Sequence, residues 1–390
     1  MDDDAFYSLQ QALESGGPTA GFEFLMRRFQ EEKKYAELFQ TRLMKKRHEL
    51  RLPLITIGPL DHLSEGARCA YEESFVQAAR EAGSLFLADG NIEAAWPYFR
   101  AIDEREPTAA AIEQLQPREG MDRVIEIAFH EQVNVRKGFE LILANYGLCK
   151  AITYFMQYPD GKSREQCLGM LVRTLHRDLV RNLKRAIAQR EGTEPEAQSV
   201  PALIAGRDWL FEDHNYYIDT SHLVSVLQFS VEATERETLV LALELTEYGS
   251  HLSSLYQHRL DPPFENVYAD HAVYLRAALG DNVDVAVAHF REKLTQTDSN
   301  RSDSGAAQVV VRLLAHLGCY AEAVEVSLDH LRHVDPALLS CPSVLQLCQL
   351  AGDHNQLMKL ARERGDLLSF AAAALQAKSQ GRTLQPPVGA

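Results

Sequence analysis

The sequence predicts an all-α protein, and three observations support that prediction. Only 15 prolines and 22 glycines interrupt the 390 residues. Leu, Ala, Glu and Arg, which favour helices, fill the long stretches between them. Alternating runs of Val, Ile and Thr, which are typical of strands, are nearly absent. The one brief candidate, residues 52–57, lies among prolines and is interpreted as an extended connector.

The N-terminal part, residues 1–117, is predicted to form helical hairpins. Apolar residues recur at helical spacing over 22–29 and again over 35–43, which indicates two antiparallel helices with a short turn between them. Longer helical patterns over 65–88 and 92–102 follow. They predict a second hairpin.

The middle of the chain, residues 118–263, is predicted to be a central helical domain without an obvious repeat. Continuous helical patterns cover 136–158 and 164–190. The polar stretch at 191–199 predicts a surface loop, because it lacks apolar residues that could be buried. The segment 207–222 combines aromatic, acidic and imidazole side chains and is the most unusual part of this domain.

The C-terminal third, residues 264–377, carries an internal repeat. Gly318 and Gly352 are 34 residues apart, and so are Ala323 and Leu357. This spacing is the period of tetratricopeptide repeats, each of which is a pair of antiparallel helices. A repeat of this kind cannot bury its own apolar face, so several copies must stack.

These segments resemble tetratricopeptide repeats, and a weaker form of the pattern covers residues 65–105. In that template a glycine ends the first helix of each hairpin in a left-handed cap, the role expected of Gly90, Gly280 and Gly318. A small residue such as Ala95 lets the two helices approach closely. The resemblance implies an α-solenoid of stacked hairpins, with a helical groove that binds a protein or peptide partner.

Composition excludes several classes of partner. The net charge of −15 argues against a nucleic-acid binder, which normally carries a basic surface. No apolar run approaches the roughly 20 residues that span a bilayer, and the acidic N-terminus does not resemble a secretory signal. The six cysteines are widely scattered, and we expect them to be reduced thiols buried among apolar residues. We therefore expect a cytoplasmic protein without a membrane partner, and a disordered tail at 378–390.

A set of polar residues in the middle of the chain is the main candidate for chemistry, since the sequence contains no P-loop, dinucleotide fingerprint or zincin motif. Asp219 and His222 are three residues apart and would share a helix face, where they could bind a metal ion or act as an acid–base pair. The full set is His130, Glu131, Asp208, His214, Asp219, His222, Asp270 and His271.

The same residues also have a structural explanation. Asp219 is an ordinary N-cap residue, and the aromatic side chains near it can fill the seam between helices. We therefore favour a non-enzymatic protein–protein interaction scaffold that needs no cofactor. The alternative is a metal-binding or acid–base enzyme centred on the polar set. A homo-oligomer, in which the repeats pack against a second copy, is a third hypothesis.

Overall fold

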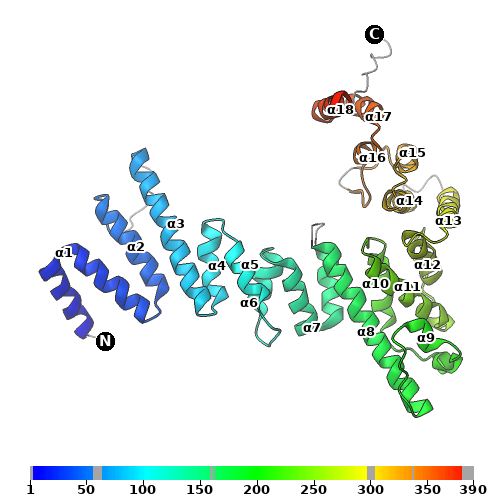
Figure 1. The fold of residues 1–390 in the computed structure, drawn as a ribbon, viewed down its shortest axis with the longest axis horizontal. Helices are drawn as coiled ribbons and strands as arrows, with labels where there is room; N and C mark the ends of the chain where they lie inside the picture. Colours follow the sequence, from blue (N-terminus) through cyan, green and yellow to red (C-terminus); the bar gives the residue numbers. More distant parts are fainter. Residues whose placement is uncertain are drawn as a thin grey trace, which may run out of the picture. The chain divides into compact units, whose positions relative to one another are not determined.

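The all-α prediction is confirmed. The computed structural model describes residues 3–55, 64–158, 161, 163–296, 304–335 and 338–379. These residues form helices, turns and loops, and no strand occurs among them. The chain divides into two compact units, Met1–Ala151 and Ile152–Ala390. Within each unit the helices follow one another in chain order (Figure 1).

Unit 1 consists of helices, most of which contact the next helix along the chain. They are α1 (Asp3–Glu31), α2 (Tyr35–Glu49), α3 (Glu65–Ala88), α4 (Ile92–Ala101), α5 (Glu106–Glu113), α6 (Asp122–Ile125), the π-helical η1 (Glu126–His130) and the first part of α7 (Val135–Gln157). The hairpins formed by α1 with α2 and by α3 with α4 lie where the apolar spacing predicts them.

The hairpin of α3 and α4 shows why small residues recur at its interface. Ala95 on α4 is completely buried, and Ala79 and Ala82 on α3 are buried as well. A Cβ atom on Gly83 would lie 2.7 Å from Cε2 of Phe99, which is also fully buried. The two helices can therefore approach closely only because their facing side chains are small.

Unit 2 begins within α7 and contains the longest helices of the middle region. Its elements are α8 (Arg164–Glu191), α9 (Val200–Ile204), η2 (Asp208–His214), α10 (Thr220–Ser230), α11 (Arg236–His251), η3 (Ser254–Tyr256), α12 (Val267–Ala278), α13 (Val283–Gln296), α14 (Gly305–His316), α15 (Tyr320–His330), α16 (Val344–Ala351), α17 (His354–Glu363) and α18 (Leu367–Ser379). Helix α8 packs against α9, α10 and α11, and from α11 onward each helix contacts the next. Tyr248, Tyr274 and Phe290 are among the largest fully buried side chains.

The hairpin turns of both units repeat one backbone geometry. The glycines at their centres are left-handed, with φ of 75° at Gly90, 93° at Gly280, 75° at Gly318 and 66° at Gly352. The residue after each glycine donates its N–H to a carbonyl five residues earlier, as in the 2.8 Å bond from Cys319 to Leu314. This arrangement is the Schellman cap, which glycine adopts without steric strain. The left-handed glycine caps expected from the sequence are confirmed.

Some details differ from the sequence-based expectation. Helix α7 is interrupted by Gly147, whose φ of 75° and ψ of −179° are not helical, whereas the pattern over 136–158 predicts a continuous helix. Cys69 and Cys149 are exposed and not buried. Of the expected tail, Lys378 and Ser379 belong to α18, and the remainder lies outside the described residues.

No helix in the described ranges has the length and apolar character needed to cross a bilayer.

Candidate functional site

His130 and Glu131 lie together in unit 1, at the end of η1. His130 is exposed, and its ring contacts that of Phe129 edge-on at 5.4 Å. The Glu131 carboxylate accepts a 2.7 Å hydrogen bond from Nε1 of Trp96 and a 3.1 Å bond from Nη1 of Arg100. Arg123 contributes a further ion pair at 3.2 Å. Glu131 thus joins α4 to the region of α6 and η1, which is a structural role.

The predicted residues of segment 207–222 lie mostly at the surface of unit 2. Asp208 and His214, at the two ends of η2, are both exposed. Asp219 is the N-cap of α10, where its Oδ1 accepts the backbone N–H groups of Ser221 at 2.8 Å and His222 at 3.3 Å. The hydrogen bond from the Ser221 hydroxyl is the main reason why the pKa of Asp219 is lowered. Asp219 therefore forms a hydrogen bond with the backbone of His222 and serves as the N-cap of α10.

Asp270 is the centre of a buried ion-pair network at the start of α12. Its side chain is 3% exposed and bonds Nε2 of His289 and Nζ of Lys293, both at 2.9 Å. Its second oxygen also accepts the backbone N–H of Asn266 at 2.8 Å. Burial lowers the pKa of Lys293, but hydrogen bonds to Glu265 and Asp270 outweigh this effect and raise the pKa above its ordinary value. The network ties α12 to α13.

His271, the neighbour of Asp270, occupies a different environment. Its ring is completely buried and stacks on Phe264 with a centroid distance of 4.1 Å. Nδ1 lies 2.6 Å from the carbonyl oxygen of Val267, whereas Nε2 has no hydrogen-bond partner among the described residues. Burial is the main cause that lowers the pKa of His271 to about 4. The histidine is therefore neutral at physiological pH.

The depressed pKa of His271 predicts a loss of stability in acid. The unfolded chain binds the proton near the ordinary pKa of 6.5, while the folded chain resists it until about pH 4. The contribution of neutral His271 to the stability is therefore fully present above pH 6.5 and is lost as the pH drops toward 4, by an amount on the order of 3 kcal/mol. Urea unfolding between pH 7 and pH 4 should show a smaller acid loss for His271→Phe than for the wild type. Equal losses in the two proteins would contradict the assignment.

The eight candidate residues do not form one site. Glu131 and Asp270 each bond a separate set of neighbours, and Asp219 is engaged by its own helix. Within the described ranges, no group of three or more His, Cys, Asp or Glu side chains is arranged to hold a metal ion. The metal-binding alternative thus finds no set of ligands in this part of the chain.

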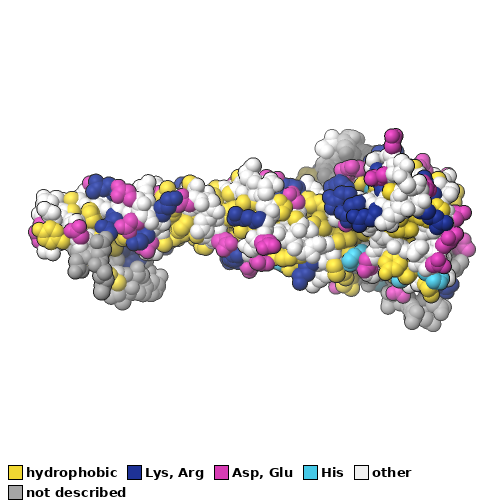
Figure 2. Space-filling view, turned by 90° about the horizontal axis from the view of Figure 1, so that it is seen from below, with side chains coloured by type: hydrophobic (Ala, Val, Ile, Leu, Met, Phe, Trp, Pro, Cys, Tyr) yellow, Lys and Arg dark blue, Asp and Glu magenta, His cyan; other side chains and the backbone are white. Residues whose placement is uncertain are grey.

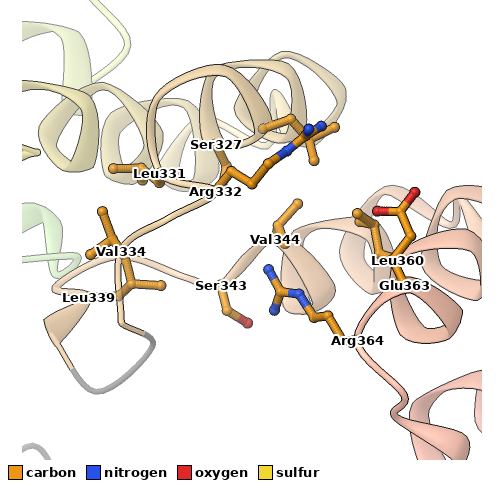
Figure 3. Close-up of a pocket in the computed structure, with 11 residues that line it drawn as sticks. Ser327, Leu331, Arg332, Val334, Leu339, Ser343, Val344, Leu360, Glu363 and Arg364 are labelled. Atoms are coloured by element: carbon orange, nitrogen blue, oxygen red, sulfur yellow. The ribbon is translucent and has the colours of Figure 1, made fainter. Parts of the chain in front are cut away.

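A concave site among the described residues lies elsewhere, between α15, α16 and α17. Its volume is about 180 Å³. The apolar lining residues are Leu328, Leu331, Val334, Leu339, Val344 and Leu360. The polar lining residues are Ser327, Arg332, Ser343, Glu363 and Arg364 (Figure 3).

Local sequence signals position the walls of this cavity. Ser343 is the N-cap of α16 and forms a capping box with Gln346, so the helix must start at the cavity edge. Asp353 is the N-cap of α17 and accepts the backbone N–H of Gln356 at 2.9 Å. Leu331, Val344 and Leu360 are buried and line the cavity.

The rim of the cavity carries two arginines from different helices. Arg332 follows the last turn of α15, and Arg364 follows the last turn of α17; both are exposed. Neither side chain forms an ion pair or a hydrogen bond with another described residue. Figure 3 shows the Arg364 side chain extending toward Ser343, while the carboxylate of Glu363 points the other way. The guanidinium groups are therefore available to a ligand.

A row of basic residues along α8 is a second surface feature. Arg177, Arg181 and Arg185 recur every four residues and are exposed. Asp178 lies 3.1 Å from Arg181 and partly neutralises the row. Figure 2 shows Lys and Arg side chains gathered in a dense group on unit 2, with acidic side chains nearby. These arginines do not line the cavity between α15 and α17, and we consider the row secondary to that site.

Sequence reasoning missed both the network around Asp270 and the cavity. His289 and Lys293 lie on the helix after Asp270, and only the packing of α12 on α13 brings them to it. For the cavity a signal was present: Arg332 and Arg364 are 32 residues apart, close to the repeat period, and each follows a predicted second helix.

No family model, curated protein or solved structure matches the chain.

Proposed function

We propose that this chain is a non-enzymatic protein–protein interaction scaffold built of stacked, tetratricopeptide-like helical hairpins. The observation that carries the proposal is the recurrence of one hairpin turn at Gly280, Gly318 and Gly352. These glycines share the left-handed conformation and the same pair of capping hydrogen bonds. Repetition of one local unit is typical of solenoid proteins, which bind other proteins along extended surfaces.

The contacts between helices of unit 2 support a stacked arrangement. From α12 to α18 each helix contacts the next, and α12 also contacts α14, the first helix of the following hairpin. The small residues Ala286 and Ala323 are buried at equivalent places in successive second helices. Each hairpin thus covers the apolar face of its neighbour, which a single repeat cannot do for itself.

The size of the cavity between α15 and α17 favours a side chain over a small molecule as its occupant. Sites for small molecules and cofactors usually enclose about 300–1,000 Å³. The cavity between α15 and α17, at about 180 Å³, is smaller than that range. It is suited to one side chain of a larger partner, whose remaining contacts would lie on the helices around it.

The proposal is tested by isolating a partner and mapping its binding surface. The full-length chain is used as bait, and the retained protein is identified by cross-linking and mass spectrometry, then purified. We expect cross-links to unit 2 and a dissociation constant on the order of 1 μM or tighter. A preparation that retains no protein would contradict the proposal. Cross-links between two copies of the chain, with a dimer seen in light scattering, would favour the homo-oligomer instead.

A further inference from the structure

We propose that the cavity between α15, α16 and α17 receives one apolar side chain from an acidic segment of a partner protein. Carboxylates on either side of that side chain would bind Arg332 and Arg364. The inference rests on the proposed scaffold function and deepens it, because it specifies the chemistry of the partner at one site. The partner segment is identified by two features together, an apolar anchor and flanking negative charge.

The apolar interior of the cavity determines which side chain of the partner can serve as the anchor. Its wall is made by aliphatic side chains, among which Leu331, Val344 and Leu360 are buried, while Leu339 and Val334 are partly exposed to the opening. An aliphatic side chain that enters this space removes apolar surface from water on both sides. The Ser343 hydroxyl accepts the backbone N–H of Gln346 at 3.4 Å and is held at the cavity edge as the N-cap of α16. An anchor of leucine, isoleucine or methionine fits these surroundings.

The positive charge at the rim of the cavity favours acidic residues on either side of the apolar anchor. Most arginines of the described chain have acidic partners, as in the pairs of Arg42 with Glu81 and Arg207 with Glu191. Arg332 and Arg364 have none within ion-pair distance among the described residues. Arg364 lies near enough to Asp366 to contribute to its lowered pKa, although the hydrogen bond from Ser369 is the main cause. Two unpaired guanidinium groups at one opening favour carboxylates, which they can bind in bidentate fashion.

The same observations favour an acidic protein segment over a nucleic acid. A single strand is usually held by aromatic side chains on which its bases stack. None of the eleven residues that line the cavity is aromatic. The net charge of −15 would also repel a phosphate backbone at a distance. A short peptide carries far less charge than a nucleic acid and can place an aliphatic group in the cavity.

Fluorescence anisotropy with the full-length chain tests this inference. The probe is a fluorescein-labelled peptide with one leucine between two pairs of glutamates. Two control peptides replace the leucine by alanine or the glutamates by lysines. We expect saturable binding of the probe, about tenfold weaker binding of the alanine peptide, and no binding of the lysine peptide.

Protein variants locate the binding site. Arg332→Glu combined with Arg364→Glu should weaken binding of the probe by at least about tenfold, and so should Leu339→Trp, which fills the cavity. The matched control, Arg185→Glu combined with Arg259→Glu, reverses two exposed arginines of the same unit and should leave the affinity unchanged. Circular dichroism checks that each variant retains the helical content of the wild type.

Three outcomes would overturn the inference: no saturable binding of the probe, equal affinity of the leucine and alanine peptides, or equal weakening by the control pair. Tighter binding of a single-stranded oligonucleotide that is lost in the Arg332→Glu/Arg364→Glu variant would assign the site to nucleic acid. These results leave the scaffold proposal to its own test, because a partner can bind unit 2 without using this cavity. The two proposals can therefore fail separately.

Discussion

Replacing Asp270 by alanine is expected to lower the free energy of unfolding by about 3 kcal/mol, since breaking a buried ion pair from one side is strongly destabilising. The carboxylate is almost fully buried and bonds His289, Lys293 and the backbone of Asn266. Without this carboxylate, Lys293 loses one of its negatively charged partners, although its side chain is only 12% exposed. The substitution also removes the acceptor of a backbone N–H at the start of α12. Urea unfolding followed by circular dichroism measures the loss.

A matched variant separates this effect from the loss of a negative charge. Asp329→Ala removes an exposed carboxylate from α15 and should change the stability by no more than about 0.5 kcal/mol. Asp270→Asn keeps the shape and one acceptor, so it should be less damaging than alanine. If Asp270→Ala were no more destabilising than Asp329→Ala, the network would not hold α12 to α13 as described.

Gly249→Ala is expected to destabilise unit 2 by about 2–3 kcal/mol, the usual result of forcing extra volume into a packed core. Gly249 is buried near the end of α11, and Tyr268 on α12 packs directly against its backbone. A Cβ atom there would lie 2.2 Å from Cδ1 and 2.4 Å from Cε1 of the tyrosine ring. Tyr268 cannot easily move away, because it is buried and its hydroxyl donates to the carbonyl of Tyr256 at 3.0 Å.

Gly66→Ala is the control for this substitution. Gly66 also lies in a helix, α3, but it is exposed, and a Cβ atom there would meet nothing within 4 Å. Alanine favours helix over glycine, so this change should raise the stability by up to about 1 kcal/mol. Thermal unfolding of both variants gives the comparison. Similar shifts in the two proteins would show that the contact with Tyr268 does not limit the spacing of α11 and α12.

The helices and their turns were largely predictable, because short-range signals determine them. The 34-residue spacing of Gly318 and Gly352 and the turn at Gly90 mark positions where only a left-handed residue closes the hairpin. The same cap also occurs without glycine: Lys33 and Asp103 have φ of 56° and 54° at the ends of α1 and α4. Sequence patterns do not reveal such positions, because the side chain gives no sign of the backbone strain.

The polar set was harder to interpret from the sequence alone. Asp219 and His222 are close in the chain, and their spacing suggested a shared site. In the structure, however, the carboxylate of Asp219 accepts hydrogen bonds from the backbone at the start of α10. Asp270 depends on His289 and Lys293, which only the packing of the next helix brings near. Arg332 and Arg364 likewise meet at one opening only after three helices have packed. Long-range contacts of this kind leave no local pattern, and the only trace of the two arginines in the sequence is their spacing of 32 residues, close to the repeat period.

The most direct test of the scaffold proposal is calorimetric titration of the isolated partner into the full-length chain and its surface variants. Arg276→Ala combined with Gln349→Ala removes exposed side chains from α12 and α16, the first helices of two hairpins. We expect this variant to bind at least about tenfold more weakly than the wild type. The control, Arg185→Ala combined with Gln189→Ala, makes the same two changes on α8 and should bind as the wild type does. Equal affinity of all three proteins would contradict the proposal that the repeat helices form the binding surface.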